Sequence, residues 1–451
     1  MDEKESFITE NKNEFEKLLE QFIALKSVSA TGTGITETVS FLEKLLQDLL
    51  KAQVKIVQTP GNPIILAKIA GQSDKNVLFY GHYDVMTPGD LKQWKTEPFK
   101  LKKSDGRMFG RGVGDNKGQL MAQILGLYTY LQVHQNFPYN ITLFIEGEEE
   151  QGSKDLAPTI KKLAKSELKD IDTAFVVDGS FGADGTHVLR MGNRGMLAFQ
   201  LSVETGTHDN HSGNLGNIME NPFVKLLRYL DKIYDYQTNT VKIPHFYDGV
   251  EMSNHQQFDW INRLPYDKES IQKQSGINKL NFDKETYYEN LMFKPTFNFS
   301  SVKSGYMGEG VKTIIPHTAS ITIDSRLVGK QSIPVIKDNL EALLKSGLDS
   351  GELKLKYLGE EPPSQTTALK EQTEQVYQAI VRATGKAYIE PAMPGTVPNY
   401  VWTDILKVPV FTIPYANYDQ HNHDVNENLT EKAFLDGIRI SYELCAVFRK
   451  N

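Results

Sequence analysis

The spacing of apolar residues predicts helices and strands that alternate along the first part of the chain. Apolar positions recur at helical spacing over residues 13–23, 37–50, 118–133 and 156–168. Short apolar runs that favour strands lie at residues 54–57, 64–69, 76–80, 139–145 and 173–177. Such alternation is typical of an α/β sheet with helices on both faces.

The pattern changes between residues 195 and 359, where polar and aromatic residues mix. Residues 243–275 look irregular, whereas residues 297–302 and 319–327 resemble strands, which predicts an antiparallel α+β insertion. The α/β pattern then returns with a predicted helix, strand and helix at 370–384, 408–412 and 431–449.

These patterns predict an α/β fold with a mixed, mainly parallel sheet flanked by helices and interrupted by an inserted α+β domain. We expect residues 1–193 and 367–451 to form the first and second parts of the α/β domain. Residues 194–366 would form the insertion.

Composition narrows the chemistry. The chain has 451 residues, 39% of them hydrophobic, and its net charge of −7 argues against nucleic-acid binding. The chain starts with acidic residues, so we expect no secretory signal. It has no run of 18 apolar residues, so we expect no membrane-spanning helix. Cys445 is the single cysteine, which excludes a multi-cysteine zinc site and favours a reduced, cytoplasmic setting. Any metal must be held by His, Asp and Glu.

Five polar motifs follow predicted strands, open a predicted helix or lie late in the chain. Open α/β sheets place their ligands where strands end. The motifs are GHYDV at 81–85, GRGVGDNKG at 110–118, EGEEEQGS at 146–153, VVDG at 176–179 and HNHDVNE at 421–427. Oxygen and imidazole ligands without thiolate suit Zn²⁺, Mn²⁺ or Co²⁺.

Each motif taken alone has an ordinary alternative. His82 and Asp84 face the same side of an extended segment, so Asp84 can orient the imidazole, although a polar turn would look similar. The glycine-rich loop at 110–118 suggests phosphate binding, but it lacks the nucleotide-binding patterns, and Asp115 would repel phosphate. The acidic cluster at 146–150 is explained by a bound cation or by a solvated turn.

The motifs taken together predict a paired metal site. Two ions about 3.5–4 Å apart, bridged by a carboxylate and a water, would supply a nucleophile and polarise a carbonyl. A spare glutamate beside a ligand glutamate suits proton transfer. No G-x-S-x-G motif is present, which disfavours a serine α/β hydrolase.

With these motifs in this order, the sequence resembles the M20 metallopeptidases, and most closely the carnosinase-like cytosolic dipeptidases. The resemblance covers nearly the whole chain. Its further markers are HSG at 211–213, KTIIP at 312–316, SRLV at 325–328, GTVP at 395–398 and HDVNENL at 423–429.

The resemblance implies a catalytic α/β domain with two divalent metal ions, with Zn²⁺ as the first choice and Mn²⁺ or Co²⁺ as alternatives. Asp115 would bridge the ions, His82 and Asp178 would complete one site, and Glu150 and His423 the other.

Three further expectations concern residues next to these ligands. Glu149 would be the general base that activates the metal-bridging water and then protonates the leaving amine, and Asp84 would steady its histidine. His421 competes with His423 for one ligand position, and the HDVNENL register favours His423. The Asp115–Asn116 peptide is expected to be cis.

The insertion resembles the family's lid and dimerisation domain, which implies a homodimer. His211 would reach the partner subunit's active site and stabilise the oxyanion there. Arg326 and Thr313 match residues that hold the substrate's terminal carboxylate, and the loop with Gly395 and Thr396 is expected to contact substrate.

Two departures from the family pattern affect substrate recognition. Close relatives have Arg-Glu-Gly before a Gly-Ser-Ile-Pro loop, whereas this chain has Ala-Met-Pro at 392–394 and Gly-Thr-Val-Pro at 395–398. Residues 362–365 replace a segment that contains a histidine in relatives. The catalytic residues are thus present, while recognition of the substrate's end is left open.

The leading functional hypothesis is hydrolysis of the amide bond of dipeptides or short peptides. An aspartate at position 178 favours it over the family's carboxypeptidases and deacylases, where glutamate is usual. An N-acyl-amino-acid deacylase with the same centre is the enzymatic alternative. An inactive homologue that binds peptide or serves as a scaffold is the non-enzymatic alternative.

Overall fold

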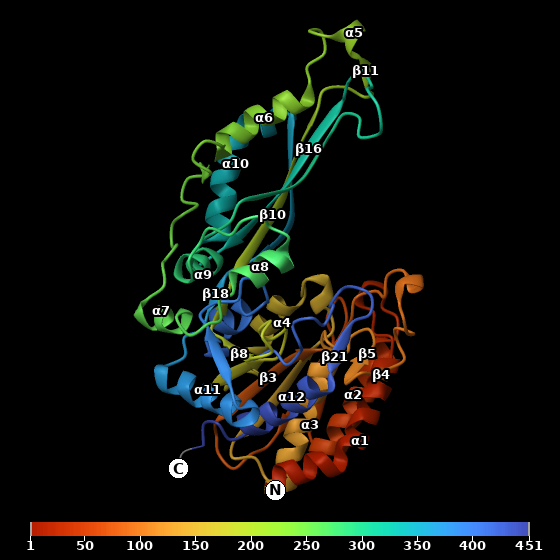
Figure 1. The fold of residues 1–451 in the computed structure, drawn as a ribbon, viewed down its shortest axis with the longest axis vertical. Coiled ribbons are helices and arrows are strands. Elements are labelled where there is room, and N and C mark those ends of the chain that lie inside the picture. The colour runs from red at the N-terminus through yellow and green to blue at the C-terminus, as the bar shows by residue number, and fades with distance from the viewer. Residues whose placement is uncertain (1, 450–451) are drawn as a thin grey trace.

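The computed structural model describes residues 2–449. Figure 1 shows an α/β body that contains α1 (Glu3–Ala24) and α12 (Glu431–Leu444), the first and last helices described, and an elongated sheet-and-helix body that projects from it. The described helices include none that is long and apolar enough to span a membrane.

The α/β body is built on a sheet of eight strands within the described residues. In spatial order these are β1 (Gln53–Val57), β2 (Ile64–Ile69), β6 (Asn140–Glu146), β3 (Asn76–His82), β7 (Thr173–Val176), β20 (Val410–Thr412), β8 (His187–Arg190) and β19 (Ala387–Glu390). The pairs β6–β3, β3–β7, β7–β20 and β8–β19 are parallel and the others antiparallel. The mixed, mainly parallel sheet is therefore confirmed.

Helices cover both faces of this sheet, and the strands are apolar on both sides for that reason. In β3, Val77 and Phe79 belong to the core on one face, and Leu78 and Tyr80 to the core on the other. The first face is covered by α1 (Glu3–Ala24), α2 (Ile35–Leu50), α3 (Lys117–His134), α11 (Lys370–Thr384) and α12 (Glu431–Leu444). The second is covered by α4 (Leu156–Leu163) and the π-helical segment Val401–Leu406.

The projecting body contains the antiparallel sheet that the sequence predicted. Its order is β14 (Asn298–Ser304), β16 (Thr318–Leu327), β10 (Gly195–Glu204) and β17 (Leu353–Glu361). One face packs on α6 (Pro222–Ile233) and α10 (Ile333–Asp349) around an apolar core. The inserted α+β architecture is confirmed, while its exact limits at residues 194 and 366 stay a prediction.

Residues 243–275 were expected to be irregular, and that expectation is wrong. They contain α7 (His255–Ile261) and α8 (Lys268–Ser275), and α9 (Lys284–Phe293) follows. Within residues 243–275, α7 buries only Ile261 and α8 buries no residue, so neither helix has an apolar stripe to detect. The side chains of Asn254 and Asp267 cap them at their N-termini instead.

The remaining elements are short. They are β4 (Lys102–Ser104), β5 (Arg107–Phe109), β9 (Gly192–Asn193), β11 (Asn210–His211), β12 (Tyr234–Asp235), β13 (Thr240–Val241), β15 (Ile314–Ile315), β18 (Ser364–Gln365), β21 (Asn428–Thr430), α5 (Ser212–Leu215), and the 3-10 turns Ser29–Thr31, Leu91–Gln93 and Glu149–Gln151.

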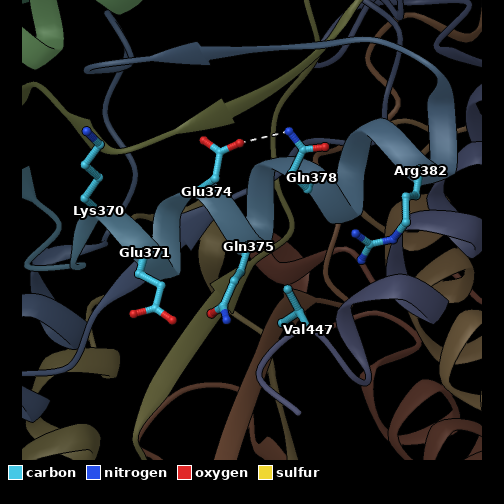
Figure 2. Close-up of a pocket in the computed structure, with 7 residues that line it drawn as sticks. All are labelled: Lys370, Glu371, Glu374, Gln375, Gln378, Arg382 and Val447. Carbon is cyan, nitrogen blue, oxygen red and sulfur yellow. Dashed lines mark hydrogen bonds between the residues drawn. The ribbon is translucent and has the colours of Figure 1, made fainter. Parts of the chain in front are cut away.

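A surface hollow follows α11 (Figure 2). Its wall consists of side chains of that one helix together with Val447, and Gln378 donates a hydrogen bond to Glu374 there. None of the predicted site residues lines this hollow, so the predicted chemistry lies elsewhere.

Candidate metal centre

Three neighbouring strands end at the same edge of the central sheet. β3 pairs in parallel with β6 on one side and with β7 on the other. His82 ends β3, Glu149 and Glu150 lie in the turn after β6, and Asp178 follows β7. Because parallel strands present their carboxyl ends together, motifs that are distant in the sequence meet here.

Asp115 and His423 reach the same edge from other elements. Asp115 lies directly ahead of α3, and its peptide bond to Asn116 is cis, as predicted. His423 lies in the loop between β20 and β21. Pairing of β21 with β5 holds that loop beside the glycine-rich loop.

Asp115 lies between two histidines. Its Oδ1 is 3.2 Å from His82 Nε2, and its Oδ2 is 3.2 Å from His423 Nε2. The side-chain amide of Asn422 donates a 3.2 Å hydrogen bond to Oδ2. Each carboxylate oxygen of Asp115 therefore faces a different imidazole.

The ligand atoms form two groups, and within each group they lie within 4.8 Å of one another. One group is His82, Glu149 and Asp178, and the other is Asp115, Glu150 and His423. His421, the rival of His423, is exposed and belongs to neither group. The structure thus brings together all five predicted ligands and the predicted base.

The donors fit divalent metal ions better than they fit one another. Glu150 Oε2 lies 2.9 Å from His423 Nε2, yet no group among residues 2–449 donates a hydrogen bond of suitable geometry to this buried oxygen. A buried carboxylate oxygen without a hydrogen bond is costly. Imidazole and carboxylate donors without thiolate match Zn²⁺, Mn²⁺ or Co²⁺.

Asp84 positions three of these residues at once. Its Oδ1 is 3.2 Å from Nδ1 of His82, which leaves Nε2 to face Asp115. The same carboxylate accepts hydrogen bonds from the backbone N–H groups of Glu149 and Glu150, at 3.2 and 3.1 Å. Fixing the second nitrogen of a histidine in this way is typical of metal ligands.

The predicted oxyanion residue lies away from this edge within one chain. His211 ends β11 at the tip of the projecting body (Figure 1), where its Nε2 is 3.2 Å from the hydroxyl oxygen of Thr313. Both residues are exposed. They are near each other but not near the metal-ligand groups of their own chain.

Arg326 does not lie with Thr313, although both were predicted to hold the same carboxylate. Thr313 precedes β16, and Arg326 is near its other end, eight strand residues or about 27 Å from Thr318. Arg326 Nη1 instead donates a 2.5 Å hydrogen bond to the hydroxyl of Thr396 in the loop after β19. Gly395 precedes Thr396 in that loop, so it lies in the same region.

A family comparison decides what kind of chain this is. The sequence model of peptidase family M20/M25/M40 matches residues 78–446, which include all of the metal-ligand candidates. The chain belongs to peptidase family M20/M25/M40. The resemblance inferred from the motifs is therefore confirmed.

Three similar proteins show how far the likeness extends. Beta-Ala-His dipeptidase from Rattus norvegicus is 28% identical over 84% of this M20 chain and 79% of its own length. A probable di- and tripeptidase from Saccharomyces cerevisiae is 28% identical over 94% of this chain, which spans 49% of that longer protein. The crystal structure of an M20 family metallo-carboxypeptidase from Sulfolobus solfataricus has a TM-score of 0.87 at 28% identity, covering 96% of this chain and 99% of that one.

The carboxylates of this M20 centre differ in how strongly the neighbouring histidines favour their charged form. Burial opposes ionisation of Asp115, but hydrogen bonds and charge from His423 and His82 outweigh it and hold its pKa well below the usual range. The same contacts with Asp115 and Glu150 raise the pKa of His423 to about 10. For Asp178, burial and then the charge of Asp115 outweigh the opposing charge of His82 and raise its pKa to about 6.

The electrostatic surroundings of Glu149 suit proton transfer. Burial, followed by the charges of Asp178 and Asp115, raises its pKa well above the usual range, against the opposing charge of His82. Its Oε2 lies 3.9 Å from His82 Nε2. A carboxylate with a raised pKa is a stronger base, which suits a group that takes a proton from water and then passes it on.

Glu427 supports the glycine-rich loop of this M20 chain. The sequence motifs alone assigned no role to this residue. This fully buried carboxylate accepts hydrogen bonds from the backbone N–H groups of Gly112, Gly114 and Asp115, at 2.8 to 2.9 Å. The buried guanidinium of Arg111 pairs with it at 2.8 Å. Its place inside the HDVNENL motif was the one available signal.

Proposed function

We propose that this chain is a dipeptidase that hydrolyses the amide bond of dipeptides or short peptides with two divalent metal ions. The observation behind the proposal is Asp115, whose two oxygens each lie 3.2 Å from a different histidine. A carboxylate in that position can be shared by two ions. His82 and Asp178 would hold one ion, and Glu150 and His423 the other.

The ions would lower the pKa of water and polarise the substrate carbonyl. Zn²⁺ is the first choice, with Mn²⁺ or Co²⁺ as alternatives. Glu149 would take the proton from the attacking water and give it to the leaving amine. Asp84 holds the backbone of Glu149 and the ring of His82, so the base and one ligand keep a fixed relation.

The substrate's terminal carboxylate would bind beside Arg326. Its guanidinium already contacts Thr396 in the loop after β19, and an arginine fork matches a carboxylate. The relative from Rattus norvegicus is named a dipeptidase, and Asp178 was the feature of the sequence that favoured this class.

The active unit would be a homodimer. His211 and Thr313 are in contact with each other and exposed at the tip of the projecting body, away from their own metal-ligand groups. In a twofold dimer, the same tip of a partner copy could reach the site. His211 would then donate to the developing oxyanion, and Thr313 would help to hold the carboxylate in trans.

Two rival activities use the same centre. A carboxypeptidase is favoured by the name of the structure from Sulfolobus solfataricus. An N-acyl-amino-acid deacylase would accept a blocked amine.

One substrate panel separates these activities. The protein is stripped of metal, reloaded with Zn²⁺, Mn²⁺ or Co²⁺, and assayed on Ala-Leu, N-acetyl-Ala-Leu and a hexapeptide ending in Ala-Leu. We expect about two ions per chain and the highest kcat/KM on Ala-Leu. A clear preference for the acetylated substrate or for the hexapeptide would overturn the dipeptidase proposal.

A further inference from the structure

Glu361 is a partly buried carboxylate that the proposed mechanism does not use. It ends β17, and its Oε1 is buried without a hydrogen-bond donor among the described residues. Burial raises its pKa to about 7, and the charge of Arg326 partly offsets this. A buried carboxylate without a donor is costly unless a ligand supplies one.

The strand register places Glu361 on the same side of the sheet as Arg326. Met196 of β10 pairs with Arg326 on one neighbouring strand and with Glu361 on the other. With neighbouring strands about 4.8 Å apart, the two charged residues flank Met196 at about 10 Å between Cα atoms.

A β-bulge makes this arrangement possible. The register between β10 and β17 shifts at Ala198/Phe199, so that Leu358 has no partner and the alternation of sides is reversed beyond it. Glu360 therefore faces α10 and pairs with Lys337 at 2.6 Å, while Glu361 faces the opposite way.

That opposite face of the sheet meets the catalytic domain. Arg326 donates to Thr396 there, and the guanidinium Nε of Arg194 donates to the carbonyl oxygen of Pro394 at 2.7 Å. Burial, and then the charges of Glu361 and Glu146, raise the pKa of Tyr400, so both carboxylates are near enough to Tyr400 to act on its hydroxyl.

We propose that Glu361 selects substrates whose C-terminal residue has a cationic side chain, such as lysine or arginine. This rests on the proposed function, in which Arg326 holds the terminal carboxylate. The methylene stem of the side chain would pack on Met196, which lies between the two charged residues. Its charged end would donate to the free oxygen of Glu361.

The test compares two dipeptides that differ in one charged group, Ala-Lys and Ala-norleucine, on the metal-loaded enzyme. The wild type should favour Ala-Lys. Glu361→Gln should lower kcat/KM for Ala-Lys about 10- to 100-fold, mainly through KM, which is the usual effect of losing a charged hydrogen bond. The value for Ala-norleucine should stay within about twofold.

Two variants serve as controls. Glu360→Gln removes a neighbouring charge that faces α10, so it should leave the ratio between the substrates unchanged. Glu361→Asp keeps the charge on a shorter stem and should retain part of the preference for Ala-Lys. Equal losses on both substrates, or no change in their ratio, would overturn the role of Glu361. Failure of the wild type to hydrolyse either dipeptide would instead overturn the proposed function.

Discussion

The backbone N–H of Asp115 donates a 2.9 Å hydrogen bond to Oε1 of Glu427, a residue 312 positions further along the chain. The same carboxylate accepts from two glycine N–H groups of the loop and pairs with Arg111. Asp115, the residue proposed to bridge the two ions, is thus held in place by the buried side chain of Glu427 from the C-terminal part of the chain.

Removing this support should destabilise the protein. Glu427→Ala leaves three backbone donors and the Arg111 guanidinium without their acceptor, and breaking such a buried pair costs about 3–5 kcal/mol. We expect a loss of that size in the free energy of unfolding, measured with urea. Asp419→Ala breaks an exposed pair with Arg107 and should cost at most about 1 kcal/mol. Equal losses for both variants would contradict the role of Glu427.

Removing the proposed base should separate activity from metal binding. Glu149→Gln keeps the shape of the side chain but cannot accept the proton, so kcat should fall at least about 100-fold. Metal content, measured by atomic absorption, should stay at the wild-type value. Glu148→Gln is the matched control, because Glu148 lies beside Asn62 and Asp155 rather than His82. A Glu149→Gln enzyme with normal kcat would refute the mechanism.

A mixing experiment tests whether His211 acts in trans. His211→Asn and Glu149→Gln homodimers should each be nearly inactive, because loss of an oxyanion donor costs about 10²–10³ in kcat. Subunit exchange should restore about one quarter of wild-type activity, since half of the dimers are mixed and one site in each has both residues. Mixtures that stay inactive, although subunits exchange in a fluorescence assay, would show that His211 is not supplied by the partner.

The metal-free protein should lose stability as pH rises from about 5 to 8. Burial is the main cause that raises the pKa of Glu146 to about 8, of Glu427 to about 7 and of Glu361 to about 7. A carboxyl group with a raised pKa in the folded state favours folding below its ordinary pKa, and this contribution is lost as pH passes its folded pKa. The pKa of Asp115 is lowered, so this residue changes the stability of the protein only at pH values below about 5.

Thermal unfolding measures this effect. With metal removed, Tm should be several degrees lower at pH 8 than at pH 5.5. Glu146→Gln keeps an acceptor for the Tyr80 hydroxyl but cannot ionise, so the fall in Tm between pH 7 and 8 should shrink. A Tm that rises between pH 5.5 and 8 would contradict the pKa directions.

The sequence predicted those parts of the site in which local pattern and local chemistry coincide. His82 ends an apolar strand and Glu150 lies in an acidic turn, but each motif alone also fits a polar turn, so only the order of all the motifs and the family resemblance singled out these ligands. The prediction of irregular structure for residues 243–275 was wrong because the helices there depend on N-terminal caps and bury little. Such helices show no periodic spacing of apolar residues.

The sequence by itself determined the α/β order, the antiparallel insertion and the residue types that can bind metal, because burial imposes a period on each element. Tertiary structure alone decided which of those residues meet. Asp115 lies between His82 and His423 only because parallel strands end together and β21 pairs with β5. The tertiary structure also placed Glu361 on the same side of the sheet as Arg326, because one bulge residue reverses the side on which the following residues of the strand lie. The local sequence does not show which strand will pair with β17, so it could not predict this arrangement.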